Sequence, residues 1–268
     1  MKNPDIKAMQ AYITKLRQLN ILLVDDDRLN AKLASILFAQ HGLTLQLAEN
    51  GLQAVDMIKT GSFDIVLMDM EMPVMNGYQA TSLIRQQLKN NIPIIALTAH
   101  AIAGEREKCL SYGMTDHIVK PIVPNLLFKI MYHAVSSIKI PSTKKRHSTL
   151  RTKPVAFDKV CNMDYLESIT RGNKKNIQNI TSVFFKETRK ELACLTRAIE
   201  KTNYPVISDI SHKIKSAFYI LGISVLEPVF NEMELLSSST SPTSKMVPLN
   251  DRINIVFKQA RAEMKAAQ

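Results

Sequence analysis

Residues 20–137 alternate short apolar runs with amphipathic stretches of helical spacing, and this alternation is what most constrains the fold. The apolar runs read NILLV (20–24), LTLQLA (43–48), FDIVLM (63–68), IPIIAL (92–97) and HIV (117–119). Continuous apolar strands separated by helices are typical of a parallel sheet covered on both faces. We therefore predict an α/β domain over residues 20–137, with a short leading helix in residues 1–19.

Polar residues follow four of the predicted strands. Asp25 and Asp26 follow the first run, Asp69 the third, Thr98 the fourth and Lys120 the fifth. The carboxyl ends of the strands in an open α/β sheet form its ligand crevice, and the flavodoxin-like order 2-1-3-4-5 would make the acidic residues converge there. Any one of these residues could be a polar residue leaving a strand. Their joint occurrence on four strands argues against coincidence.

Three carboxylates at close quarters repel one another unless a cation is present or a proton is taken up. A site of oxygen ligands alone suits a hard ion, and Mg²⁺ (or Mn²⁺) is the expected cofactor. Lys120 would add a fixed positive charge and Thr98 a hydroxyl donor. Together these groups could hold a phosphoryl group on an aspartate.

Four motifs carry a family resemblance, namely ILLVDDD, IVLMDMEMPVMNGYQA, IIALTAHA and HIVKPI. In order and spacing they resemble the receiver domain of two-component response regulators. The resemblance implies that Asp69 accepts a phosphoryl group from a phosphohistidine, that Thr98 binds a phosphoryl oxygen and that Lys120 pairs with the phosphoryl group. It also implies metal ligands at Asp25, Asp26, Asp69 and the backbone carbonyl of Glu71. His117 stands where the family has an aromatic switch residue.

Residues 157–268 show no strand pattern. Four amphipathic stretches cover residues 175–201, 204–222, 224–236 and 251–267, and their short connections predict an antiparallel four-helix bundle. At 100° per residue, His212 falls almost opposite the apolar stripe of its helix, which disfavours a core histidine. From this helix alone, an idle surface histidine is as good an interpretation as a functional one, and a metal ligand is less well supported.

The segment HKIKSAFYILG and the stretches before it resemble the histidine-containing phosphotransfer (HPt) domain over about residues 158–266. The resemblance implies that His212 is a phosphoacceptor and that Lys215 steadies the phosphoryl oxygens. Beside a receiver it predicts a phosphorelay. A phosphoryl group would pass from an upstream sensor histidine kinase to Asp69, then to His212, then to the aspartate of a separate downstream response regulator.

The net charge of +11 is concentrated between the two predicted domains. Residues 138–156 hold six Lys and Arg and no Asp or Glu, and with Pro, Ser and Thr they read as a basic linker. A DNA-binding regulator is the alternative that this charge raises, but no helix-turn-helix pattern follows the receiver, and we expect no direct nucleic-acid partner. The three scattered cysteines and the lack of a long apolar run predict a cytoplasmic protein without a membrane segment.

Two further alternatives stay open. The chain has no GxxxxGK[ST] or GxGxxG motif, so it is not itself a kinase, but it could be the C-terminal receiver–HPt portion of a hybrid histidine kinase. A Mg-dependent phosphatase of the haloacid dehalogenase type also uses an aspartate nucleophile. That family places D-x-D after its first strand, whereas the matching stretch here, Asp69-Met70-Glu71, follows the third.

Overall fold

The computed structural model describes residues 4–98, 104–136 and 160–266, and the chain divides into two compact units, Met1–Ile140 and Pro141–Gln268. The predicted basic linker, residues 138–156, lies outside the described residues. No helix in the described part of the chain is both long and apolar enough to cross a membrane.

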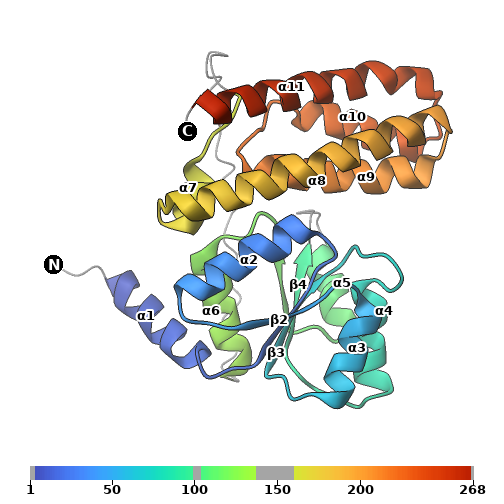
Figure 1. Ribbon diagram of the computed structural model, residues 1–268. Helices are drawn as coiled ribbons and strands as arrows, with labels where there is room; N and C mark the ends of the chain where they lie inside the picture. The colour runs from blue at the N-terminus through green and yellow to red at the C-terminus, as the bar shows by residue number, and fades with distance from the viewer. Residues whose placement is uncertain (1–3, 99–103, 137–159, 267–268) are drawn as a thin grey trace. The chain divides into compact units, whose positions relative to one another are not determined.

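Unit 1 is built on one five-stranded sheet whose strands are all parallel (Figure 1). The strands are β1 (Ile21–Val24), β2 (Leu45–Ala48), β3 (Ile65–Asp69), β4 (Ile94–Thr98) and β5 (Asp116–Val119). Their order is β2-β1-β3-β4-β5, which confirms the predicted flavodoxin-like arrangement. The register pairs Val24 with Met68 and Thr98 with Val119, so the residues that follow these strands emerge at one edge of the sheet.

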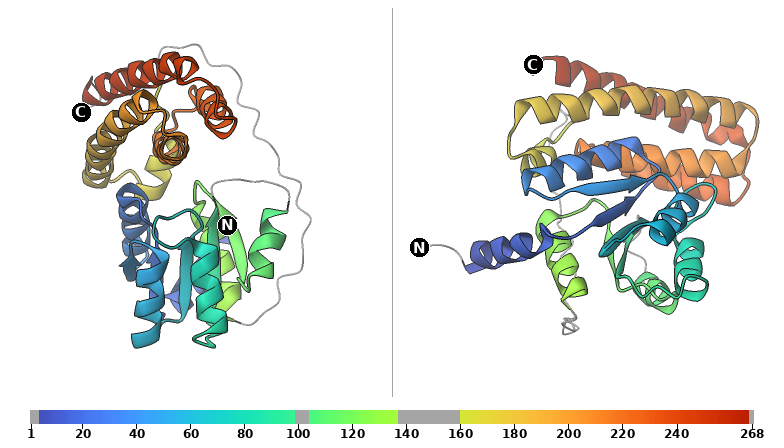
Figure 2. Two further views of the ribbon diagram at one scale, coloured as in Figure 1. Left: turned by 90° about the vertical axis from the view of Figure 1, so that its right-hand side faces the viewer. Right: turned by 60° about the horizontal axis from the view of Figure 1, so that its bottom comes forward.

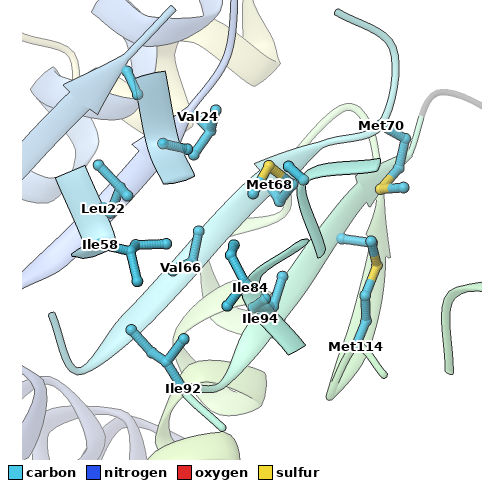
Figure 3. Close-up of a cluster of buried hydrophobic side chains, with 14 of the residues drawn as sticks. Leu22, Val24, Ile58, Val66, Met68, Met70, Ile84, Ile92, Ile94 and Met114 are labelled. Carbon is cyan, nitrogen blue, oxygen red and sulfur yellow. The ribbon is translucent and has the colours of Figure 1, made fainter. Parts of the chain in front are cut away.

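Alternate side chains of the strands enter two cores, one on each face of the sheet. On one face, Leu22, Val66, Met68 and Ile94 join a buried cluster with residues of the helices α3 (Gly51–Thr60), α4 (Gly77–Gln86) and α5 (Glu105–Ser111) (Figure 3). The other pair of helices, α2 (Arg28–Gln40) and α6 (Pro124–Val135), bring together Phe38 and Phe128, with ring centroids 5.5 Å apart. The sheet is therefore covered on both faces, as continuous apolar strands require.

Side-chain caps fix where three of these helices begin. The side chains of Asp27, Asn50 and Asn76 accept hydrogen bonds from the first backbone N–H groups of α2, α3 and α4. These N–H groups have no partner within the helix, so a capping oxygen stabilises each helix start. At the start of α4, Gly77 allows a close approach, because a Cβ there would lie 2.5 Å from the backbone oxygen of Asp69.

The N-terminal helix α1 (Pro4–Leu16) packs against α6 within unit 1. The rings of Tyr12 and Tyr132 have centroids 4.5 Å apart, and Leu16 is fully buried. The helix that we expected to lead into the domain thus contributes to its packing.

Unit 2 is all-α in its described residues, as predicted. Its helices are α7 (Asp164–Thr170), α8 (Lys174–Glu200), α9 (Tyr204–Ile220), α10 (Glu227–Ser238), the short 3₁₀ helix η1 (Thr243–Lys245) and α11 (Val247–Ala266). Helix α8 contacts α9 and α11, and α10 contacts the same two helices (Figure 2). The core is aromatic and holds Phe184, Phe218, Phe230 and Phe257.

The structure explains why a Leu-Gly pair, Leu221 and Gly222, follows α9. Gly222 has a φ of +63°, a left-handed backbone conformation that commonly ends helices and that residues with a Cβ rarely adopt. The backbone oxygen of Leu221 accepts a hydrogen bond of 3.0 Å from the N–H of Asn162, and a Cβ at Gly222 would collide with the carbonyl of the same asparagine. This pair therefore joins the end of α9 to the start of the described part of unit 2.

Candidate functional site

The carboxyl ends of β1, β3 and β5 bring Asp25, Asp69 and Lys120 into direct contact. The Lys120 Nζ atom lies 2.7 Å from Asp69 Oδ2 and 3.0 Å from Asp25 Oδ2. Both aspartates are buried, at 5% and 8% exposure. The Lys120–Pro121 peptide bond is cis. Three residues that are far apart in the sequence thus form one ion cluster at the predicted edge of the sheet.

Asp26 completes an acidic group that could hold a metal ion. Asp25, Asp26 and Asp69 each offer a carboxylate oxygen, and the three oxygens lie within 4.8 Å of one another. Two of these residues are buried and Asp26 is half-buried, so the group opens to solvent on one side. Carboxylate oxygens with room for water are the ligands that Mg²⁺ prefers, and the donor set fits that ion.

The electrostatic balance of the cluster is set by burial and by Lys120. Burial is the largest influence on Asp69 and raises the pKa of its carboxyl well above the ordinary value; Asp25 adds to the rise and Lys120 opposes it. Burial alone would lower the pKa of Lys120, but Asp25 and Asp69 outweigh it and raise that pKa. The Lys120 ammonium therefore stays charged, whereas the Asp69 carboxylate takes up a proton more readily than an ordinary aspartate unless a further cation offsets the negative charge.

Asp27, the third aspartate of the first motif, has a different role. Its side chain caps α2, accepting from the backbone N–H groups of Leu29 at 2.7 Å and Asn30 at 3.1 Å. Its own N–H donates to Asp25 Oδ1 at 2.9 Å. Asp27 therefore fixes the helix start and helps to orient Asp25. We did not predict this role from the sequence, although the helical pattern that begins directly after Asp27 is a signal that could have indicated it.

Thr98 and Glu71 lie at the same edge of the sheet. Thr98 ends β4 and is buried, and its Oγ1 lies 3.5 Å from the carbonyl oxygen of Ile118. Glu71 is exposed two residues after Asp69, and its N–H lies 3.4 Å from Asp69 Oδ1. His117 lies in β5 with its Nδ1 3.7 Å from the carboxylate of Asp116.

In unit 2, His212 and Lys215 lie on α9 beside a carboxylate of α10. Glu234 Oε1 is 3.7 Å from His212 Nδ1 and 3.2 Å from Lys215 Nζ. Lys215 also donates to Asn231 Oδ1 at 2.9 Å. Interaction with His212 is the largest influence on Glu234 and, together with Lys215, lowers the pKa of its carboxyl. The three side chains form a small polar cluster on the flank of two helices.

The His212 side chain is 18% exposed, which is less than its position opposite the apolar stripe of α9 indicates. The difference arises because α10 packs against α9 and places Glu234 next to the imidazole. Sequence reasoning missed Glu234 and Asn231. They lie on a different helix from His212, no motif connects them, and only the packing of α9 against α10 brings them there.

Comparison with known proteins identifies a receiver domain in the first unit of the chain. The family model described as response regulator receiver domain matches residues 21–132. The signal transduction histidine-protein kinase BarA of Escherichia coli K12 is 40% identical over 114 residues, which are 42% of this chain and 12% of that protein. The sensor protein EvgS of the same organism is 27% identical over 237 residues, which are 88% of this chain and 18% of that protein.

Among solved structures, the receiver domain of a sensor histidine kinase from Pseudomonas aeruginosa PAO1, which has a magnesium ion in its active site cleft, is 38% identical. The match covers 44% of this chain and 98% of that chain, with a TM-score of 0.41. These two curated relatives are much longer proteins, and this chain spans less than a fifth of the length of each.

Proposed function

We propose, from the premise that residues 21–132 are a response regulator receiver domain, that this chain is a phosphorelay protein in which Asp69 and His212 carry one phosphoryl group in turn. The observation that carries the proposal is the cluster at the strand ends, where Lys120 contacts both Asp25 and Asp69. Phosphoryl transfer depends mainly on positioning and charge neutralisation, and a buried carboxylate next to a fixed ammonium supports both.

In the first step, a carboxylate oxygen of Asp69 attacks the phosphorus of a phosphohistidine on an upstream sensor histidine kinase. A P–O bond forms, the P–N bond breaks, and the released imidazole nitrogen takes up a proton. Lys120 offsets the negative charge of the phosphoryl oxygens, and the hydroxyl of Thr98 donates a hydrogen bond to one of them.

Asp25, Asp26, Asp69 and the backbone carbonyl of Glu71 would hold Mg²⁺. The raised pKa of Asp69 and the close approach of three carboxylates support a cation there. When bound, Mg²⁺ supplies further charge neutralisation on the phosphoryl oxygens.

In the second step, His212 acts as the phosphoacceptor of an HPt domain formed by a four-helix bundle of α8, α9, α10 and α11. The carboxylate of Glu234 beside Nδ1 favours the tautomer with hydrogen on Nδ1, which leaves the Nε2 lone pair free to attack. A P–N bond forms at Nε2, and the acyl P–O bond breaks to restore the Asp69 carboxylate. Lys215 balances the phosphoryl charge, and the group then passes to the aspartate of a downstream response regulator.

The first experiment tests Asp69. Incubation with acetyl phosphate and Mg²⁺ should label the chain in an acid-stable, base-labile form, and Asp69→Asn should abolish the label. Asp64→Asn is a matched control, because Asp64 is exposed at the opposite end of β3. Label that persists in Asp69→Asn at the wild-type level would remove the assignment.

The second experiment tests His212, which is the only histidine between residues 148 and 268. A phosphorylated partner receiver should label unit 2 in an acid-labile form, and His212→Gln should abolish this label while Asp69 stays reactive. Continued release of inorganic phosphate from small phosphoesters over many turnovers would instead support the phosphatase alternative.

A second candidate is that the chain corresponds to the receiver–HPt portion of a hybrid histidine kinase. The alignment with EvgS, which extends over 88% of this chain, favours it. In that case a kinase core supplied as a separate protein should phosphorylate Asp69 much more slowly than the same core joined to this chain, because a covalent link raises the effective concentration of the two groups to about millimolar.

A further inference from the structure

A groove of about 570 Å³ runs between α8 and α11 of unit 2. The N-terminal half of α8 and the C-terminal turns of α11 line it, and this pairing places the two helices antiparallel. We call it the basic groove, after its cationic lining residues Lys186, Arg189, Lys190, Arg261 and Lys265. None of its ten lining residues, all within the described part of the chain, is acidic.

The positive charge of the basic groove is largely unneutralised. Lys190 pairs with Glu187 at 2.9 Å. The other four cations form no ion pair or hydrogen bond with any residue of the described ranges, and all four are exposed. A cleft lined by charges of one sign concentrates its electric field and attracts ligands of the opposite sign. The groove is therefore suited to a polyanionic ligand.

The floor of the groove is apolar. Phe185 is half-buried there, with its ring centroid 5.7 Å from that of Phe257, and Met264 is 8% exposed. A flat anionic membrane surface could reach the rims but not this floor. An amphipathic helix can place apolar side chains on Phe185 and carboxylates on both rims, and the groove between two packed helices is where a further helix fits.

The groove lies away from His212 within unit 2. The groove is formed by α8 and α11, whereas His212 and Glu234 lie where α9 meets α10. The two helix pairs pack on each other, with α8 against α9 and α10 against α11. A ligand in the basic groove would thus leave the imidazole accessible. We propose that the basic groove is a docking site for an acidic amphipathic helix of a partner protein, which goes beyond the phosphorelay and does not depend on it.

The test measures binding of the full chain to a fluorescently labelled helical peptide of about 18 residues, with Glu on one face and Leu on the other, by anisotropy at ~50 mM and ~300 mM salt. Lys186→Glu with Lys265→Glu should weaken binding at least about tenfold, because two attractive contacts become repulsive. Lys174→Glu with Lys175→Glu is the matched control, since these exposed lysines of α8 lie outside the groove lining and change the net charge equally.

The control should bind within about twofold of the unmodified chain. Arg261→Gln, a milder change, should weaken binding about threefold and serves if the double variant fails to fold. His212→Gln should leave peptide affinity unchanged, so failure of the relay and failure of this site are distinguishable. Equal losses in groove and control variants would overturn the proposal. So would no binding of the peptide, or tighter groove-dependent binding of a single-stranded oligonucleotide or of anionic vesicles.

Discussion

The Asp69 site and the His212 site differ in what holds their groups in place. Asp25, Asp69 and Lys120 lie at the carboxyl ends of β1, β3 and β5 of one sheet, so the hydrogen-bonded register of the backbone, through β4 in the case of Lys120, sets their spacing. His212, Lys215 and Glu234 come from two helices and are placed by side-chain packing. A buried site tied to the sheet holds its charges in a fixed arrangement, whereas the half-buried site on the flank of two helices leaves its imidazole partly open to solvent.

Replacing Lys120 should have the largest effect, because it removes the cation that holds together the two buried carboxylates of the Asp69 site. Lys120→Met keeps the side-chain length but leaves two buried carboxylates without their cation, which should destabilise unit 1 by about 3 kcal/mol. Phosphorylation of Asp69 should slow about a hundredfold, as when one electrostatic contact to a transition state is removed. Chemical denaturation and the rate of labelling measure the two effects.

Added Mg²⁺ should restore part of the stability lost in Lys120→Met, because an ion that binds only the folded state stabilises it. Lys129→Met, on the exposed side of α6, should change neither quantity appreciably. If Lys120→Met is as stable as the unmodified chain without Mg²⁺, the ion cluster does not hold this edge of the sheet together.

Gly77→Ala tests whether close backbone packing supports the Asp69 site. Helix propensity alone predicts a gain in stability of up to about 1 kcal/mol. The short distance from a Cβ to the Asp69 carbonyl oxygen predicts a loss of about 2 kcal/mol, as is usual for overpacking. Thermal denaturation decides the sign. Ser82→Ala in the same helix measures propensity without the close approach, and a stabilised Gly77→Ala variant would refute the packing argument.

Glu234→Gln tests the side-chain contact at the other site. The neutral amide oxygen accepts hydrogen from Nδ1 more weakly than the carboxylate does, so transfer to His212 should slow about tenfold, the lower end of the loss seen when a metal-binding histidine loses its hydrogen-bond partner. The ¹⁵N chemical shifts of the imidazole report the tautomer directly. Glu232→Gln, exposed two residues earlier on α10, is the control. An unchanged tautomer together with an unchanged rate would show that Glu234 does not position His212.

The smallest effect concerns acid stability. The pKa of Glu234 is lowered in the folded state, so its contribution to stability is present above the unfolded-state value of 4.5 and is lost as pH falls below it. The loss should amount to less than about 1 kcal/mol, as for partly exposed ion pairs. Glu234→Gln should be less stable than the unmodified chain at pH ~7 and should lose less stability on acidification. Denaturant titrations of both proteins at pH ~7 and at a pH below 4.5 measure the difference.

The sequence was most informative where local pattern and topology agree. Four of the five strands of unit 1 end in a polar residue of the site or are followed by one, so predicting the strand order was enough to gather Asp25, Asp69 and Lys120. The capping role of Asp27, which we did not predict, could have been inferred from the helical pattern that follows it. The packing of α1 on α6 could not, because amphipathic spacing shows that a helix has an apolar face but not which surface covers it.

The surroundings of His212 were harder to predict for the same reason. Helical spacing places the residue on the polar side of α9, but its exposure depends on how α10 packs beside it and on which residues of α10 face α9. Glu234 has no sequence motif of its own and is one of several acidic residues on that helix. A contact between side chains of separate helices is set by tertiary packing, which periodicity within one helix does not encode.

The buried face of α1 affects how this protein can be divided for study. A fragment that starts at residue 20, where the receiver motifs begin, would lack Tyr12, Ile13 and Leu16 and would expose the α6 surface around Tyr132 to water. Freshly uncovered apolar area of this kind promotes self-association. Expression of the first unit on its own should therefore retain residues 4–19, and a shorter version is expected to form aggregates that gel filtration would detect.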